Sequence, residues 1–222
     1  MSELNLAQDP DEPFDVLRPD GTPTGQTKAR ALVHRDGDWH RAVHIWVAGI
    51  DQGEPFLLFQ RRNERKDTWP GRLDVAVGGH LRAGEGIVEA FREIDEEIGI
   101  RATPDAARWL GSRQCLSEAE PGILDRELQE VFLLRDDRPL TDYRPNPSEL
   151  SALVRFSLPA VIDFLAATDP AGEIEAPTLV TTGITTVMIY THGDFIPTND
   201  RYPLRVALAA QRVLRGEPDV TI

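Results

Sequence analysis

Cysteine is almost absent from this chain, which has a single one, Cys115, among its 222 residues. An internal disulfide is therefore excluded, and a hydrophobic core must stabilise the fold. A chain of this length can bury enough apolar surface for that purpose. No partner stands at a diagnostic spacing from Cys115, so we interpret it as a small core residue. Trp46, Phe195 and Tyr202 could stack on a base but are likewise interpreted as core residues.

Long apolar runs and an excess of basic residues are also missing. No run approaches the length that spans a bilayer, and residues 1–14 lack the basic and apolar segments of a signal peptide. The formal net charge of −13 would repel nucleic acid and anionic membranes. We therefore expect a cytoplasmic protein with a small phosphorylated substrate, held by a local cationic site or a metal. The sequence leaves the oligomeric state open, a homodimer included.

Strand patterns, turns and helix patterns follow one another along the chain after an acidic tail over residues 1–13. The expected strands are 14–17, 40–48, 56–60, 73–77, 108–116, 127–134 and 180–190, the second and third forming a hairpin around Gln52-Gly53. The expected helices are 87–98, 158–167 and 204–214. This order predicts an α/β (α+β) layered domain over residues 14–222, with residues 169–222 as a helical C-terminal extension.

The helix expected over residues 87–98 carries the functional argument. At 100° per residue, one side presents the apolar stripe Val88, Phe91, Ile94 and Ile98. The other side presents four carboxylates: Glu89, Glu93, Glu96 and Glu97. Such like charges destabilise a helix by roughly 0.2–0.5 kcal/mol per i,i+4 pair. An acidic surface helix would explain the cluster, but clustered hard oxygens are also what Mg²⁺ or Mn²⁺ coordination needs.

The surroundings of this helix resemble the Nudix box. Residues 92–100 read Arg-Glu-Ile-Asp-Glu-Glu-Ile-Gly-Ile, which is the complete second half of that pattern. Gly79 precedes Glu85 by the expected five intervening residues, but only six residues separate Glu85 from Arg92, one fewer than in the family. The resemblance implies a Nudix fold, a mixed sheet sandwiched between helices, and an enzyme that hydrolyses a diphosphate linkage with Mg²⁺ or Mn²⁺.

The resemblance also implies roles for individual residues. Glu93, Glu96 and Glu97 would hold the divalent metal, with a further contact from the Gly79 carbonyl. Arg92 would orient Glu96 or Glu85. The metal would neutralise the diphosphate and polarise phosphorus, while Glu93 is the first candidate for the general base. The base can also lie outside the box, and the candidates there are Glu127, Glu130 and Glu149.

Residues outside the box resemble the type I isopentenyl-diphosphate isomerases and their hydrolase relatives. Arg62 and Lys66, near Trp69-Pro70-Gly71, match positions that bind substrate phosphates, and Arg30 is a candidate third. Three histidines and two acids match a second metal site of the isomerases: His34, His40, His80, Asp125 and Glu127. The catalytic cysteine of the isomerases is replaced here by Gly78.

Three functions stay open from the sequence. The first is metal-dependent hydrolysis of a nucleoside diphosphate derivative, an isoprenyl diphosphate or a similar small molecule. The second is isomerisation of isopentenyl diphosphate, which Gly78 disfavours because the acid for proton transfer to carbon is lost. The third is a non-catalytic nucleotide-sensing Nudix module, which the presence of Glu93, Glu96 and Glu97 disfavours.

Overall fold

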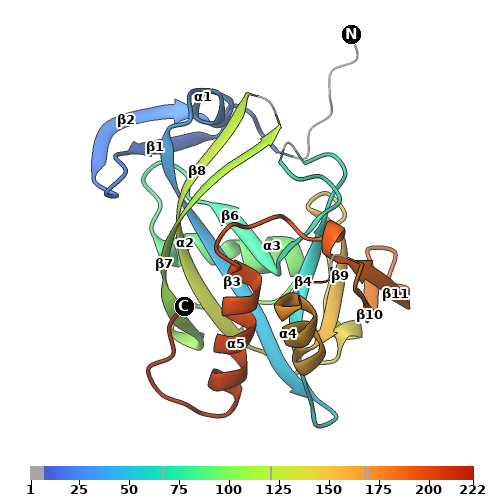
Figure 1. Ribbon diagram of the computed structural model, residues 1–222. Coiled ribbons are helices and arrows are strands. Elements are labelled where there is room, and N and C mark those ends of the chain that lie inside the picture. Colours follow the sequence, from blue (N-terminus) through green and yellow to red (C-terminus); the bar gives the residue numbers. More distant parts are fainter. Residues whose placement is uncertain (1–7, 67, 121, 168, 170) are drawn as a thin grey trace.

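A single sheet of eleven strands organises the computed structural model, which describes residues 8–222 apart from 67, 121, 168 and 170 (Figure 1). Its strands are β1 (Pro13–Leu17), β2 (Pro23–Ala29), β3 (Trp39–Asp51), β4 (Glu54–Arg62), β5 (Leu73–Val75), β6 (Val77–His80), β7 (Ala107–Glu120), β8 (Ile123–Arg135), β9 (Leu150–Ser157), β10 (Glu173–Val180) and β11 (Thr185–Thr191). Its α-helices are α1 (Arg30–Asp36), α2 (Ile87–Ala90), α3 (Arg92–Ile98), α4 (Leu158–Ala166) and α5 (Tyr202–Leu214). Three single 3-10 turns complete the described elements: η1 (Pro104–Ala106), η2 (Leu140–Asp142) and η3 (His192–Asp194).

Strand β3 lies at the centre of the sheet. The main strand order is β11-β10-β9-β4-β3-β1-β2, and β3 also pairs with β6 and, in parallel, with β8. The hairpin expected around Gln52-Gly53 is confirmed, because β3 and β4 pair antiparallel up to Asp51 and Glu54. Gln52 and Gly53 both have positive φ, at 52° and 86°. Such a two-residue turn matches the right-handed twist of the strands it joins.

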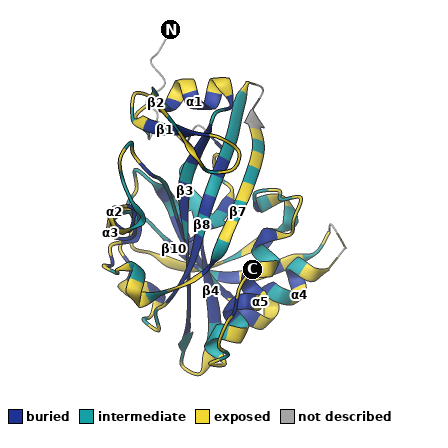
Figure 2. Cartoon of the chain, turned by 90° about the vertical axis from the view of Figure 1, so that its left-hand side faces the viewer, coloured by how far each residue is buried: buried dark blue, intermediate teal, exposed yellow. Residues whose placement is uncertain are grey.

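Alternating side chains of β3 divide the core into two layers. Val43, Ile45 and Val47 pack with the apolar residues of α2 and α3, whereas Trp46 and Ala48 pack with those of α4 and α5. Figure 2 shows the resulting sandwich, with α2 and α3 on one side of the sheet and α4 and α5 on the other. The expected mixed sheet between helices is therefore confirmed.

Some expected boundaries are wrong. The strand expected over residues 180–190 corresponds to β11, which begins only at Thr185 after a turn at which Gly183 has φ of 86°. The region 169–222 thus adds a hairpin to the sheet before helix α5. Strands β2, β9 and β10 and helix α1 were not expected, although β9 is mostly buried.

The N-terminal segment is tied to α1 as far as it is described. The backbone carbonyls of Pro10 and Glu12 accept hydrogen bonds from Ala31 and Arg30, at 3.0 and 2.8 Å. Arg82 pairs with the Glu12 carboxylate at 2.6 Å. These contacts differ from the loose tail expected over residues 1–13, of which residues 1–7 lie outside the described residues.

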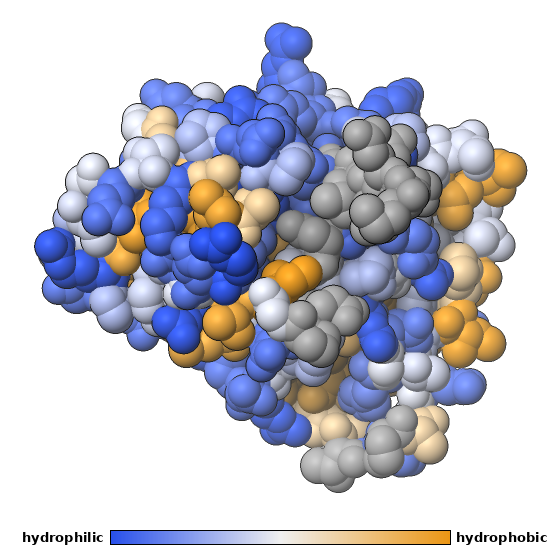
Figure 3. Space-filling view, turned by 90° about the horizontal axis from the view of Figure 1, so that it is seen from above, coloured by the Kyte–Doolittle hydropathy of each residue, from blue (hydrophilic) through white to orange (hydrophobic). Residues whose placement is uncertain are grey.

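The outer edge of β11 is apolar and exposed. Strand β11 pairs only with β10 within the described part of the chain, and Ile184, Val187 and Ile189 are 57–63% exposed. In Figure 3, apolar side chains gather at the right-hand margin of a mostly hydrophilic surface.

None of the described helices has the length and apolarity that crossing a membrane requires. A homodimer stays a prediction.

Candidate functional site

The carboxylate-bearing helix is divided in two. Helix α2 ends at Ala90, and α3 begins at Arg92 after a turn at Phe91. The predicted core position of Val88 is wrong, because Val88 is 70% exposed and Ala90 is buried in its place. The turn at Phe91 changes the register of the preceding residues against the sheet. Beyond it the expected apolar stripe holds, since Phe91, Ile94 and Ile98 are buried.

Two carboxylates of α3, Glu93 and Glu97, are drawn into the protein, whereas Asp95 and Glu96 remain exposed. Glu97 is only 2% exposed and accepts a hydrogen bond from Gln60 Nε2 at 3.0 Å. The Glu93 side chain is 16% exposed, whereas that of Glu96 is 50% exposed. The helix ends at Gly99, in the left-handed conformation with φ of 71°, as its sequence predicts. The site is therefore built chiefly around Glu93 and Glu97.

Arg92 joins three of the predicted glutamates. Its guanidinium donates to Glu85 at 3.0 Å and to Glu93 at 2.8 Å, and its Nε lies 3.6 Å from Glu96. The missing residue between Glu85 and Arg92 thus does not separate this pair. One guanidinium holds several carboxylates in fixed positions, because its donors form a rigid planar fork.

Gly79 provides the space in which Glu93 lies. A Cβ atom built on Gly79 would stand 2.6 Å from Glu93 Cγ, closer than any side chain permits. The absence of a side chain at this position therefore has a steric cause. It lets the β6 backbone and the Glu93 carboxylate approach each other, as a shared metal site would require.

Burial perturbs the two inner carboxylates. It raises the pKa of Glu93 to about 7, against the opposing charge of Arg92. It also raises the pKa of Glu97 well above its ordinary range, although the charge of Lys66 acts in the opposite direction. The charge of Glu149 adds to both shifts. Burial is therefore the main cause of both shifts, and neighbouring carboxylates add to it.

The two predicted phosphate-binding cations are buried and paired. The Lys66 ammonium lies 2.6 Å from the Glu149 carboxylate, and its side chain is 6% exposed. Arg62 pairs with Asp74 at 2.9 Å and donates to both oxygens of Thr68. Neither cation lies on a solvated loop surface. Arg30 is buried as well, and its Nη1 lies 2.9 Å from His80 Nδ1.

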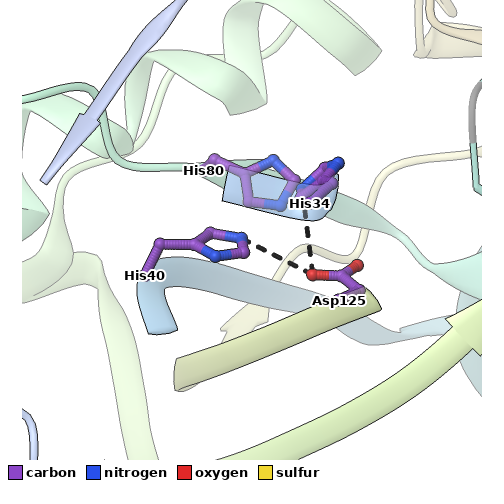
Figure 4. A group of neighbouring side chains, drawn as sticks. All are labelled: His34, His40, His80 and Asp125. Carbon is purple, nitrogen blue, oxygen red and sulfur yellow. Dashed lines mark ion pairs between the residues drawn. The ribbon is translucent and has the colours of Figure 1, made fainter. Parts of the chain in front are cut away.

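The three histidines that the sequence singled out come together with Asp125 (Figure 4). One ligand atom from each of His34, His40, His80 and Asp125 lies within 4.8 Å of the other three. The residues come from α1, β3, β6 and β8, so the fold and not local sequence assembles the group. Asp125 Oδ1 lies 3.5 Å from His40 Nε2 and 3.9 Å from His34 Nε2.

The charge states of this group suit metal binding. Burial lowers the pKa of His40 to about 4 and that of His80 well below its ordinary value. Glu127 Oε1 lies 2.8 Å from His80 Nε2. Burial alone would raise the pKa of Glu127, but this contact and the nearby histidines hold it well below its ordinary value. Neutral imidazoles and an ionised carboxylate are the forms that ligate metals.

A cavity of about 440 Å³ opens on the face of the sheet that α5 covers. Gly78, Gly79, His80 and Glu127 line one part of it, next to the histidine group. Arg62 and Trp69 line another part, and Tyr202 contributes from α5. The volume is within the range of small-molecule sites. Arg62, the acids Asp125 and Glu127 and the β6 glycines therefore adjoin one space, which Lys66 and the α3 glutamates do not line.

Cys115 also reaches this cavity, although it is distant from Gly78 in the sequence. It is half-buried and does not lie in the core, so the interpretation as a core residue is wrong. Burial raises its pKa to about 12, so the thiol stays protonated near neutral pH. It does not stand at the position of the isomerase cysteine, which is Gly78 here. Trp46, Phe195 and Tyr202 are buried as expected.

Several residues at the site were not identified from the sequence. Gln60 contacts Glu97 across 37 residues of chain, and Asn146 fixes the end of α3 by donating to the Glu96 and Glu97 carbonyls. The only sign of Gln60 in the sequence was that it is a glutamine at the end of an apolar strand. Glu130, a predicted base candidate, accepts hydrogen bonds from Trp109 and Ser112.

Known proteins share this combination of fold and motif. Residues 38–176 match the NUDIX domain family, which is more than half of the chain. The chain belongs to the Nudix family. It is 35% identical over 166 residues to Nudix hydrolase 3 of Arabidopsis thaliana, covering 72% of this chain and 21% of that protein. It is 33% identical over 139 residues to an uncharacterised Nudix hydrolase of Clostridium acetobutylicum, covering 62% of this chain and 66% of the other.

One solved structure supports the fold directly. The crystal structure of DR0079 from Deinococcus radiodurans superposes with a TM-score of 0.51 at 25% sequence identity. The match covers 71% of this chain and 91% of that one. Among the curated relatives, the match spans about a fifth of the length of the Arabidopsis protein and about two thirds of that of the Clostridium protein.

Proposed function

We propose that this Nudix protein hydrolyses a diphosphate linkage in a nucleoside diphosphate derivative or a similar small molecule. The observation that carries the proposal is that Glu93 lies against Gly79, with Arg92 bridging Glu93 and Glu85 and Glu97 buried one turn further along α3. The donor set fits Mg²⁺ or Mn²⁺, because it consists of hard oxygens with an excess of negative charge. The bound ion would neutralise the diphosphate and promote attack by water.

The protein's own residues would prepare the reaction around that ion. Glu93, Glu97 and Glu96 would hold it, and Arg92 would keep the glutamates in place. Glu93 is the proposed general base, since a pKa of about 7 suits proton transfer near neutral pH. Lys66 and Arg62 would bind the phosphates after exchanging Glu149 and Asp74 for the substrate.

The test is phosphate release from a panel of diphosphates, comparing the wild-type protein with Glu97→Gln. The panel contains nucleoside diphosphates, sugar and dinucleotide diphosphates and isopentenyl diphosphate, each with Mg²⁺ or Mn²⁺. Metal-dependent turnover that falls at least 100-fold in the variant supports hydrolysis at this site. Turnover that survives in Glu97→Gln would refute it. Binding of diphosphates without turnover of any of them would favour the nucleotide-sensing alternative.

A second proposal concerns the histidine group. We propose that His34, His40, His80 and Asp125, with Glu127 beside them, hold a transition metal ion, because three imidazoles and a carboxylate suit such ions. Metal content after purification without chelator tests this. One equivalent of Zn²⁺ or Mn²⁺ is expected in the wild type and in Glu97→Gln, and less than a tenth of it in His40→Ala. Equal metal content in His40→Ala would exclude the site.

A further inference from the structure

His44 lies on β3 and lines the cavity, but neither metal cluster uses it. Its Nδ1 lies 3.1 Å from the hydroxyl of Tyr202, the first residue of helix α5. Its Nε2 end faces the β6 backbone, since a Cβ built on Gly78 would stand 3.9 Å from that atom. No hydrogen-bond partner for Nε2 occurs among the residues that the structure describes. Because His44 lines the cavity, a ligand in that space could reach this nitrogen.

The hydrogen bonds around Tyr202 decide which nitrogen of His44 carries the proton. Trp46 Nε1 can only donate, and it donates to the Tyr202 hydroxyl oxygen at 2.9 Å. The phenol keeps its own proton, because burial raises its pKa well above the ordinary value. Among the described residues, the one acceptor for that proton is His44 Nδ1. Burial also lowers the pKa of His44, so the ring is neutral. A neutral ring that accepts at Nδ1 carries its hydrogen at Nε2.

We propose that His44 is a specificity-determining residue that donates its Nε2–H to an oxygen or nitrogen acceptor in the organic part of the substrate. Tyr202 is the positioning residue, because its hydroxyl fixes the tautomer of His44. This inference rests on the proposed function and narrows its substrate class. It favours diphosphates whose organic group carries an acceptor, as a nucleoside does. It disfavours purely hydrocarbon groups such as isopentenyl, which would leave a buried donor without a partner.

His44 lines the same cavity as Arg62 and the backbone of Gly79. Gly78 and Gly79 face opposite sides of β6, toward His44 and Glu93 respectively. A small molecule with its diphosphate at Arg62 and Gly79 and its organic group in the cavity would therefore reach His44. Arg113 stacks over the Tyr202 ring at 3.9 Å and helps to keep the phenol in place.

The experiment compares two non-hydrolysable ligands of nearly equal shape, the 3-methoxypropyl and pentyl esters of methylenebisphosphonate. They differ by one ether oxygen in place of a methylene, and calorimetry in the presence of Mg²⁺ gives both dissociation constants. We expect the wild type to bind the methoxypropyl ester about 10- to 100-fold more tightly. The ratio of the two dissociation constants should fall to near one in His44→Leu. It should be largely kept in His44→Gln, whose amide can both accept and donate.

Tyr202→Phe tests the positioning role. This variant should reduce the ratio of the two affinities several-fold, because either nitrogen of His44 can then carry the proton. A purely structural defect would weaken both ligands equally and leave their ratio unchanged. A wild-type ratio near one, an unchanged ratio in His44→Leu, or no binding of either ester would overturn the proposal. Because neither ester can be hydrolysed, these outcomes are independent of whether the protein is a hydrolase.

Discussion

Replacing Glu93 with glutamine should stabilise the metal-free protein while it abolishes hydrolysis. Burial raises the pKa of Glu93 to about 7 from an ordinary value of 4.5. Each unit of such a shift corresponds to about 1.4 kcal/mol, so the ionised carboxylate costs the fold about 3 kcal/mol when fully charged. The side chain is 16% exposed, so little of this cost is screened by solvent. Glutamine keeps the shape and removes the charge.

The pH dependence of this gain follows from the direction of the shift. Below about pH 4.5 the carboxyl is protonated in both folded and unfolded chains, and the substitution should change the free energy of unfolding little. Between that pH and about 7 the unfolded chain ionises first, so the wild type loses stability as the pH rises. Above about pH 7 the full difference in the free energy of unfolding between the wild type and Glu93→Gln is present.

Urea unfolding in EDTA at pH 5 and pH 8 measures this effect. We expect Glu93→Gln to be more stable than the wild type by about 2–3 kcal/mol at pH 8, and by less than about 1 kcal/mol at pH 5. Glu175→Gln, an exposed glutamate on β10, serves as the matched control and should change neither value. Excess Mg²⁺ should stabilise the wild type and not the variant. A variant that is less stable than the wild type at pH 8 without metal would refute the reasoning.

Three further substitutions or treatments test separate parts of the site. Gly79→Ala should displace the Glu93 carboxylate and reduce kcat at least 100-fold, because the new Cβ would stand 2.6 Å from Glu93 Cγ. The control is Gly193→Ala, where the atom nearest to the new Cβ is 3.5 Å away, and it should leave kcat unchanged. Lys66→Met should raise KM for a diphosphate about 10-fold or more by removing a buried cation, and an unchanged KM in steady-state kinetics would exclude a role in phosphate binding. Cys115 should react with iodoacetamide at pH 7.5 at least 100-fold more slowly than free cysteine, because burial raises its pKa to about 12. Mass spectrometry would measure this rate. A rate comparable to that of free cysteine would contradict the prediction and mean that the cavity is open and polar around the thiol.

The sequence predicts the parts of this protein whose determinants lie close together in the chain. The α3 carboxylates, the stop at Gly99 and the hairpin at Gln52-Gly53 each depend on a local period or turn. The position of Val88 shows the limit of that reasoning, because the turn at Phe91 changes the register of α2. Helical periodicity assumes an unbroken helix, and the turn at Phe91 breaks it.

Contacts between distant segments could be predicted only in part. The histidine group was suggested by resemblance, since no local pattern relates His34 to Asp125. The partners of Lys66 and Arg62 were not predicted, because Glu149 and Asp74 reach them only through the folding of the sheet. The contribution of Tyr202 to the environment of His44 spans 158 residues of sequence. Such pairings depend on strand register, which the sequence specifies only through the whole fold.

The central position of β3 has a consequence for motion within the site. Strand β3 carries His40 and His44 and pairs with β1, β4, β6 and β8. Opening its backbone hydrogen bonds would require separating much of the sheet, so its amide protons should be among the slowest to exchange with solvent. We therefore expect the histidines on β3 to be anchored to the part of the sheet that fluctuates least.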